Sequence, residues 1–124
     1  GAAREAALLG YPAIAWSQYF IPSNAVDWSL AATAASGLFS ELKQKPQSPG
    51  TYWNINFPDP GYLQSDPARW QAAPLDHHPL PVRYEKQADG YHYRCDYQQR
   101  GSAPGSDVAT CFAGTTTVTQ LKIG

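Results

Sequence analysis

The sequence predicts an α/β fold in which strands and helices alternate along the chain. Residues 1–10 have the pattern of an amphipathic helix that ends at Gly10, and residues 11–17 follow as an apolar strand. A helical apolar pattern then covers residues 24–44, and a second apolar strand covers residues 51–57. A strand, a helix and a strand in this order form a right-handed crossover, so we expect the two strands to be parallel.

The first helix and strand have nothing upstream to begin the helix or to pair the strand. We therefore expect the chain to be a piece of a larger α/β protein. The sequence contains no methionine, even at position 1, which indicates that its first residue arises by processing or truncation. With 124 residues the chain is long enough to bury roughly two thirds of its unfolded surface, so a hydrophobic core is expected.

The second helix has the clearest local signals. Ser23 or Asn24 can cap its first turn after Pro22, and Pro46 prevents it from continuing. One face carries an apolar stripe made of Val26, Leu30, Ala34, Leu38 and Leu42. These signals predict a helix that packs one side on a sheet and ends in a solvated basic segment.

The remainder of the chain divides into three parts. Residues 58–81 are rich in proline and follow neither structural period, so we expect an irregular surface excursion anchored by Trp70. Residues 82–97 surround the turn signal Asp89-Gly90 and predict a β-hairpin. Residues 98–124 should contain a short helix and a strand, while residues 1–57 form the remnant of the sheet domain.

The last helix and strand are predicted from caps and alternation. Ser106 can cap a helix over residues 107–112, and Gly114 can end it. Threonines alternate with other side chains over residues 115–122, a pattern typical of an edge or half-exposed strand.

Charge and apolar content exclude several partners. The net charge is −1 and the sequence pI is about 6.3, which argues against electrostatic binding to nucleic acid or to an anionic membrane. No apolar run approaches the roughly 20 residues that span a bilayer. Cys95 and Cys111 lack metal-ligand spacing, so we expect two reduced, half-buried thiols in a cytoplasmic protein.

Two polar clusters carry weak chemical signals. Asp76-His77-His78 combines metal-ligating residue types, but consecutive side chains rarely converge on one ion, so we expect a solvated loop and no metal there. Ser106 and Asp107 have the types of a nucleophile or phosphate binder, yet a helix N-cap is the better interpretation. No catalytic residue is assigned.

Ser17 and Asn56 are the candidate substrate-lining residues. Each lies at the carboxyl end of a predicted parallel strand, and ligands of open α/β sheets bind in the crevice outside those ends. The alternative is that both side chains only satisfy backbone groups where the strands end.

Three blocks of the chain resemble the C-terminal half of the survival protein SurE family. The first is the helix followed by Gly10–Ser17, with Pro-Ala-Ile-Ala at its centre. The second is Trp53–Pro58, with the sequence Trp-Asn-Ile-Asn-Phe-Pro, and the third runs from Gly105–Ala109 through Gly114 to Thr115–Leu121. The blocks agree in order and approximate spacing, although residues 62–80 match nothing in the pattern.

The resemblance implies a fold and an activity. The fold would be the C-terminal portion of a three-layer αβα, Rossmann-like domain whose protruding hairpin arm takes part in subunit contact. The activity would be that of a metal-dependent 5'/3'-nucleotidase and acid phosphatase acting on nucleotides or small phosphoesters. The family holds its divalent metal, Mg²⁺ or Mn²⁺, with a paired-aspartate motif and a later Ser and Asn in the N-terminal half. Those positions are not in this sequence, so we expect no bound metal and no activity from this segment alone.

Two functional hypotheses therefore remain. In the first, the chain is part of a nucleotidase that hydrolyses nucleoside monophosphates. In the second, it is a non-catalytic interaction domain that uses the tyrosines on one hairpin face, Tyr91, Tyr93 and Tyr97, to bind another protein or to self-associate. We expect a homo-oligomer with the hairpin in the contact. A weaker variant has these tyrosines and Arg94 stack nucleobases, which the acidic charge balance disfavours.

Overall fold

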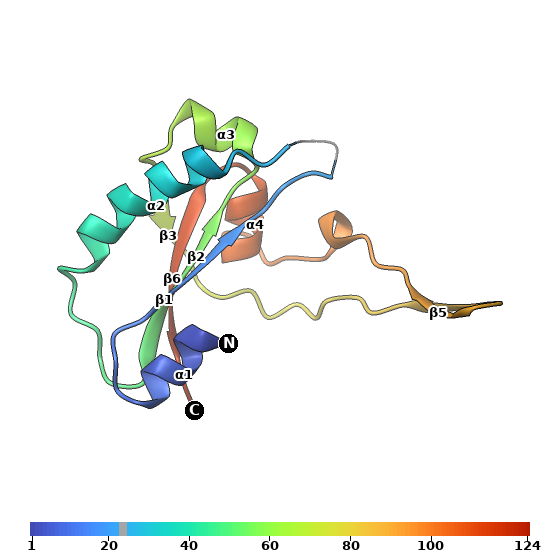
Figure 1. Cartoon of the computed structure of the whole chain (residues 1–124), viewed down its shortest axis with the longest axis horizontal. Helices are drawn as coiled ribbons and strands as arrows, with labels where there is room; N and C mark the ends of the chain where they lie inside the picture. The colour runs from blue at the N-terminus through green and yellow to red at the C-terminus, as the bar shows by residue number, and fades with distance from the viewer. Residues whose placement is uncertain (23–24) are drawn as a thin grey trace.

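The computed structural model describes residues 1–22 and 25–124 and shows an α/β body with a hairpin standing off it (Figure 1). The helices are α1 (Ala2–Leu8), α2 (Trp28–Leu42), α3 (Pro60–Ser65) and α4 (Asp107–Phe112), with a 3-10 turn η1 (Tyr97–Gln99). The strands are β1 (Ile14–Gln18), β2 (Thr51–Phe57), β3 (Trp70–Ala72), β4 (Tyr84–Gln87), β5 (Gly90–Tyr93) and β6 (Thr116–Lys122). The predicted α/β fold with a protruding hairpin is confirmed.

The main sheet has the strand order β1-β2-β6-β3. β1 and β2 are parallel, as the crossover predicts, and β6 runs antiparallel to β2. The register places Ser17 beside Asn56, and Asn56 beside Thr117. Because paired residues share a face of the sheet, these three polar side chains form one row across it.

The hydrophobic core lies between the sheet and helices α2 and α3. Its buried residues are Ala34, Leu38, Leu42, Ile55, Phe57, Leu63 and Val118. Alternate residues of β2 face α2, while α4 lies on the opposite side of the sheet (Figure 1). The face that carries the polar row is thus left to α4 and to the connections around it.

Helix α2 is shorter than predicted. It begins at Trp28 instead of near residue 24, and Asp27 is its N-cap, with the Oδ1 atom accepting from Leu30 N at 3.0 Å. Ser23 and Asn24, the predicted caps, lie outside the described residues. Asp27 ends in an acceptor positioned to satisfy a free N–H of the first turn, so it sets the start of the helix.

The segment 58–81 is more regular than predicted. Asp59 caps α3 by accepting from Gly61 N at 3.1 Å, and Pro60 occupies the first turn, where a proline is favourable. β3 then joins the sheet beside β6, and Trp70 packs against the core. The Trp70 indole donates to Glu41 at 3.1 Å, so Trp70 is the anchor expected from the sequence.

β6 is an inner strand, and the prediction of an edge or half-exposed strand is wrong. β2 and β3 pair with its two sides, and its first four residues, Thr116–Thr119, are buried. Thr119 Oγ1 donates to the carbonyl oxygen of Ala73 at 2.9 Å, which satisfies its buried hydroxyl. The threonine alternation looked solvated because the second partner, β3, lies in the segment predicted to be irregular.

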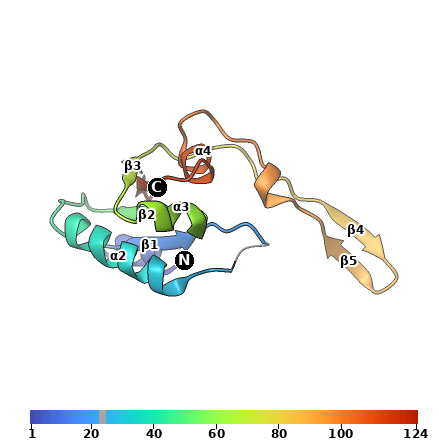
Figure 2. The same ribbon diagram turned by 90° about the horizontal axis from the view of Figure 1, so that it is seen from above.

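The hairpin is narrower than the predicted range 82–97. Its strands pair Tyr84 with Tyr93 and Gln87 with Gly90, and Gly90 has a φ of 137° that favours glycine. The hairpin extends well away from the body in both views (Figure 1 and Figure 2).

Within residues 1–22 and 25–124, no helix is long and apolar enough to cross a membrane.

Tyr97 does not lie on the hairpin face with Tyr91 and Tyr93. The strand ends at Tyr93, and Tyr97 begins the 3-10 turn η1, where its ring meets Phe112 of α4 at 5.8 Å. The alternation that grouped the three tyrosines requires a continuous strand, but β5 ends at Tyr93 and Asp96 caps the turn that follows.

Candidate functional site

The polar row formed by Ser17, Asn56 and Thr117 crosses the sheet near the carboxyl ends of the parallel strands β1 and β2. Ser17 Oγ donates to Asn56 Oδ1 at 2.5 Å, and Asn56 Nδ2 donates to Thr117 Oγ1 at 3.5 Å. Ser17 is exposed, Asn56 is half-buried and Thr117 is fully buried. The structure thus brings the two sequence-predicted residues into direct contact, with Thr117 fixing the inner end of the row.

The row opens on a cleft of about 480 Å³. The cleft is bounded by the end of β1, the segment that follows it, β2, α4 and η1. Its lining residues are Ser17, Gln18, Tyr19, Phe20, Pro22, Asn54, Asn56, Leu75, Asp76, Tyr97, Gln98, Arg100, Asp107, Val108, Cys111 and Phe112. A concave site with a few convergent polar groups at strand ends is the usual location for a ligand in an α/β sheet.

Helix α4 forms one wall of the cleft, and its first turn is capped as predicted. Ser106 Oγ accepts from Ala109 N at 3.2 Å. Asp107 is buried, and its Oδ1 atom accepts from Asp76 N at 2.7 Å and from Val108 N at 2.9 Å. The Asp107 carboxylate therefore joins the helix to the segment that leads to the hairpin.

Asp76 is not part of a solvated loop, contrary to the prediction. Its side chain is only 1% exposed and accepts from Ala103 N at 2.7 Å and from His78 N at 2.8 Å. The Arg100 guanidinium lies 3.8 Å from the carboxylate. The Asp76 carboxylate thus holds both ends of the hairpin arm together, a long-range role that a local reading of Asp-His-His does not show.

Hydrogen bonding explains the acidity of Asp76. A hydrogen bond from the Ser106 hydroxyl, followed by those from the Ala103 and His78 backbone, lowers the pKa of Asp76 well below its usual range, against the opposing effect of desolvation. His77 and His78 are exposed. Asp76 is therefore an ionised structural acceptor beside the cleft and not a proton donor at neutral pH.

The two cysteines are free thiols, as expected. Cys95 is half-buried, but Cys111 is buried more deeply than predicted. Burial, with a further contribution from the Asp107 charge, raises the pKa of the Cys111 thiol to about 12. Since the thiolate is the reactive form of cysteine, Cys111 lines the cleft as an inert apolar group.

The described acidic and imidazole side chains do not fit a metal ion. Over residues 1–22 and 25–124, no three His, Cys, Asp or Glu side chains come together in a group that could hold one. The buried acids near the cleft accept backbone N–H groups instead, as Asp76 and Asp107 do. A divalent-metal site needs several such oxygens around one point, and the described residues do not provide that arrangement.

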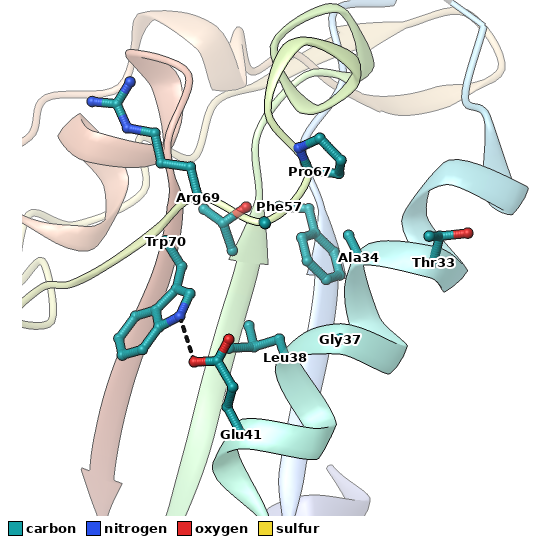
Figure 3. A pocket seen from close by; sticks show the side chains of 11 residues that line it. Thr33, Ala34, Gly37, Leu38, Glu41, Phe57, Pro67, Arg69 and Trp70 are labelled. Atoms are coloured by element: carbon teal, nitrogen blue, oxygen red, sulfur yellow. Dashed lines mark hydrogen bonds between the residues drawn. The ribbon is translucent and has the colours of Figure 1, made fainter.

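A second pocket, of about 150 Å³, lies between α2 and the segment that joins α3 to β3 (Figure 3). Phe57 and Leu38 project into it, and the Glu41–Trp70 hydrogen bond lies at its side. Its lining is mainly apolar and continuous with the core. It lacks the converging polar groups of the larger cleft, which makes it a packing gap rather than the functional site.

Comparison with known proteins now places the chain in a family. The model of survival protein SurE matches residues 1–78. The chain belongs to the SurE family. It is 34% identical to a protein of Synechocystis sp. and 37% identical to one of Nostoc sp., both named "Putative 5'-nucleotidase alr3139", over 98% of this chain in each case.

The SurE relatives are longer than this chain. It spans about half the length, 54%, of each of those two proteins. The crystal structure of SurE from Aquifex aeolicus matches with a TM-score of 0.69 and covers 97% of this chain and 49% of that one, at 18% identity. This likeness shows the SurE fold, so the resemblance expected from the three sequence blocks is confirmed.

Several residues of the cleft were not predicted from the sequence. Thr117 is paired with Asn56 across two antiparallel strands, and Arg100 reaches the cleft from the far side of the hairpin. Tyr19 and Phe112 also line the cleft, and no sequence pattern marked either of them. The Asn-x-Asn spacing could have revealed Asn54 as a lining residue, because it places Asn54 on the same face of β2 as Asn56.

Proposed function

We propose that this chain forms the substrate-side portion of a metal-dependent nucleotidase that hydrolyses nucleoside monophosphates, a phosphomonoester hydrolase of the SurE type. The observation that supports it is the row of Ser17, Asn56 and Thr117 opening on a cleft at the carboxyl ends of parallel strands, in a chain of this family. The names of the Synechocystis and Nostoc relatives agree with this substrate class.

The row has a defined polarity that suits substrate positioning. Asn56 uses its carbonyl oxygen toward Ser17 and its amide nitrogen toward Thr117, so its side chain is held at both ends. Ser17 is exposed at the outer end, and because its hydroxyl hydrogen is donated to Asn56, its oxygen lone pairs are the groups available to a polar substrate. No three His, Cys, Asp or Glu side chains among the described residues come together to hold the Mg²⁺ or Mn²⁺ that this chemistry would use.

The replacement Asn56→Ala tests this function in the full-length protein. We expect kcat/KM for a nucleoside monophosphate to fall by about tenfold to a hundredfold, because losing the link between Ser17 and Thr117 displaces a group at the cleft by a distance of the order that costs this much. Steady-state assays of phosphate release with Mg²⁺ or Mn²⁺ present provide the measurement.

Ser40→Ala is the matched control for that experiment. Ser40 lies on the exposed side of α2 and donates only within its own helix, to Ser36 O at 3.1 Å. It should keep wild-type activity. If the wild-type protein fails to hydrolyse nucleoside monophosphates, or if Asn56→Ala retains full activity, the proposal is wrong.

The hairpin supports a second proposed role, in homo-oligomer formation. It projects from the body, and Tyr91 and Tyr93 are 72% and 49% exposed. Tyr84 and Tyr93 meet edge to face at 5.5 Å, which forms an aromatic patch at a distance from the core. Exposed aromatic groups on a projecting arm are suited to contact with a second copy of the chain. Tyr97 is removed from this patch because it packs at the cleft.

Replacing Tyr91 and Tyr93 with Ser together should shift the full-length protein toward the monomer. The helices belong to the body and not to the hairpin, so the helical signal in far-ultraviolet circular dichroism should change little. Sedimentation velocity gives the mass, with Tyr11→Ser as a control because Tyr11 is 67% exposed on the body. A wild-type monomer at high micromolar concentration would contradict this role.

A further inference from the structure

Three aromatic rings form a continuous row along the wall of the cleft. Tyr19 and Phe112 are stacked, with ring centroids 4.2 Å apart and an interplanar angle of 19°. Tyr97 lies next to Phe112 at 5.8 Å, and the Arg100 guanidinium lies over Tyr97 at 5.5 Å. The four side chains come from the segment after β1, from α4, from η1 and from the residue after η1, so the tertiary fold assembles the row.

The row borders the same cleft as the polar residues. Tyr19, Phe112, Tyr97 and Arg100 all line the cavity of about 480 Å³ into which Ser17 opens. Tyr97 is 42% exposed, and Tyr19 and Phe112 are half-buried, so part of this aromatic surface is in contact with solvent. Partly exposed aromatic rings in a concave site favour a flat apolar ligand, because its binding removes their faces from water.

The same wall has polar capacity that the described residues do not use. Gln18 Oε1 and Arg100 Nε are buried and have no hydrogen-bond partner. The Gln18 side-chain amide donates both of its hydrogens, to the carbonyl oxygens of Tyr19 and Pro58, so its Oε1 atom is the acceptor without a partner. Gln18 and Arg100 both line the cleft that the aromatic row borders, but the two atoms are enclosed by protein, so the partly exposed rings and not these atoms carry the contact with a ligand.

We propose that Tyr97, Phe112 and Tyr19 form a stacking subsite for the nucleobase of the substrate. The inference rests on the proposed nucleotidase function and deepens it, since it names the part of the substrate that this wall binds. Every nucleobase has a π-face, so stacking gives affinity without strict base selection, and purines overlap the rings more than pyrimidines do. Arg100 is held by Asp76 and by a hydrogen bond to His78 O at 3.0 Å, so it presents its charge at the Tyr97 end of the row.

Tyr97 is the residue to test, because its exposure makes its removal tolerable to the fold. The comparison uses the full-length protein with Tyr97→Ala, Tyr97→Phe, which keeps the ring, and Tyr11→Ala, which removes an exposed tyrosine from the body outside the cleft. Isothermal titration calorimetry with a chelator present measures Kd for adenosine 5'-monophosphate and for ribose 5-phosphate, which share the phosphorylated ribose and carry adenine or a hydroxyl group at its C1 atom.

We expect the wild-type protein to bind the nucleotide at least about tenfold more tightly than ribose 5-phosphate, as one base-stacking contact is worth a factor of this order. Tyr97→Ala should remove most of that preference without changing Kd for ribose 5-phosphate. Tyr97→Phe and Tyr11→Ala should keep it. Equal affinity of the wild-type protein for both ligands, no binding of the nucleotide, or an unchanged preference in Tyr97→Ala would each overturn the subsite.

Hydrolysis is measured separately, so that the two proposals can fail independently. A base preference in Kd without phosphate release in Mg²⁺ or Mn²⁺ keeps the subsite and rejects the nucleotidase. Phosphate release from both ligands without a base preference keeps the phosphatase chemistry and rejects the subsite. A ring needed only to pack η1 against α4 would change thermal stability in Tyr97→Ala and leave the ratio of the two Kd values unchanged.

Discussion

Residues 1–124 alone should show no chelator-sensitive hydrolysis of nucleoside monophosphates, whereas the full-length protein should hydrolyse them in Mg²⁺ or Mn²⁺. The physical reason is that phosphoryl transfer needs concentrated positive charge at the phosphoryl oxygens. Among the described residues no three His, Cys, Asp or Glu side chains come together to hold a metal, and Arg100, a cation that lines the cleft, is paired with Asp76 and His78. Phosphate release from equal molar amounts of both proteins provides the measurement.

Folding of the isolated segment must be checked in the same experiment. Far-ultraviolet circular dichroism and tryptophan fluorescence report the α/β body, since Trp53 and Trp70 pack against the core. Nucleoside 5'-phosphate turnover by the folded segment that disappears with chelator would contradict the prediction. It would also mean that the cleft contains a metal site that the described side chains do not suggest.

Leu38→Ala should lower the free energy of unfolding by about 2–5 kcal/mol. Leu38 lies on the buried face of α2 and is 5% exposed, in a core that includes Ile55 and Val118. Removing its branched side chain leaves a cavity between the helix and the sheet in addition to the lost burial. Urea unfolding followed by fluorescence gives the free energy.

Phe39→Ala is the matched control for that measurement. Phe39 is the next residue on the same helix, but it is 50% exposed and lies outside the core cluster. Although it loses a larger side chain, it should cost less than Leu38→Ala. A larger loss for Phe39→Ala would show that α2 buries its other face, for example against a further part of the full-length protein.

The outer edge of β1 is the place where a further part of the full-length protein would pack beside α2. β1 pairs with β2 on one side, and no strand within residues 1–22 or 25–124 pairs with its other side. Trp16 of β1 and Phe39 of α2 line a groove along this edge together with Pro46. A further strand from the full-length protein placed there would cover both side chains, and the stability of the isolated segment would then understate the effect of Phe39→Ala.

Local patterns were sufficient where one element carries its own signal. The helical stripe that includes Leu38 predicted which face of α2 is buried, and Ser106 was correctly identified as the cap of α4. The strand–helix–strand order predicted that β1 and β2 are parallel. From that order alone, Ser17 and Asn56 were expected at one end of the sheet, and the structure places them in contact.

Features that depend on distant partners were not available from the sequence. β6 was predicted to be half-exposed because its threonines alternate, but β3 covers its second side and buries Thr117. Asp76 was expected in solvent, but it accepts from Ala103, which follows it by 27 residues. In both cases the stabilising partner is far away along the chain, and a polar residue has no period that reveals a distant donor.

The sequence by itself determined the α/β class, the parallel pair, the hairpin and the strand-end residues Ser17 and Asn56, because helix and strand periods and the right-handed crossover depend on neighbouring residues. Only the tertiary structure decided the composition of the cleft wall. Tyr97 was grouped with the hairpin by alternation, yet the chain turns at Asp96 and carries its ring to Phe112. Tyr19 and Phe112 meet across 93 residues of sequence for the same physical reason: their stacking depends on packing α4 against the sheet, which no local pattern specifies.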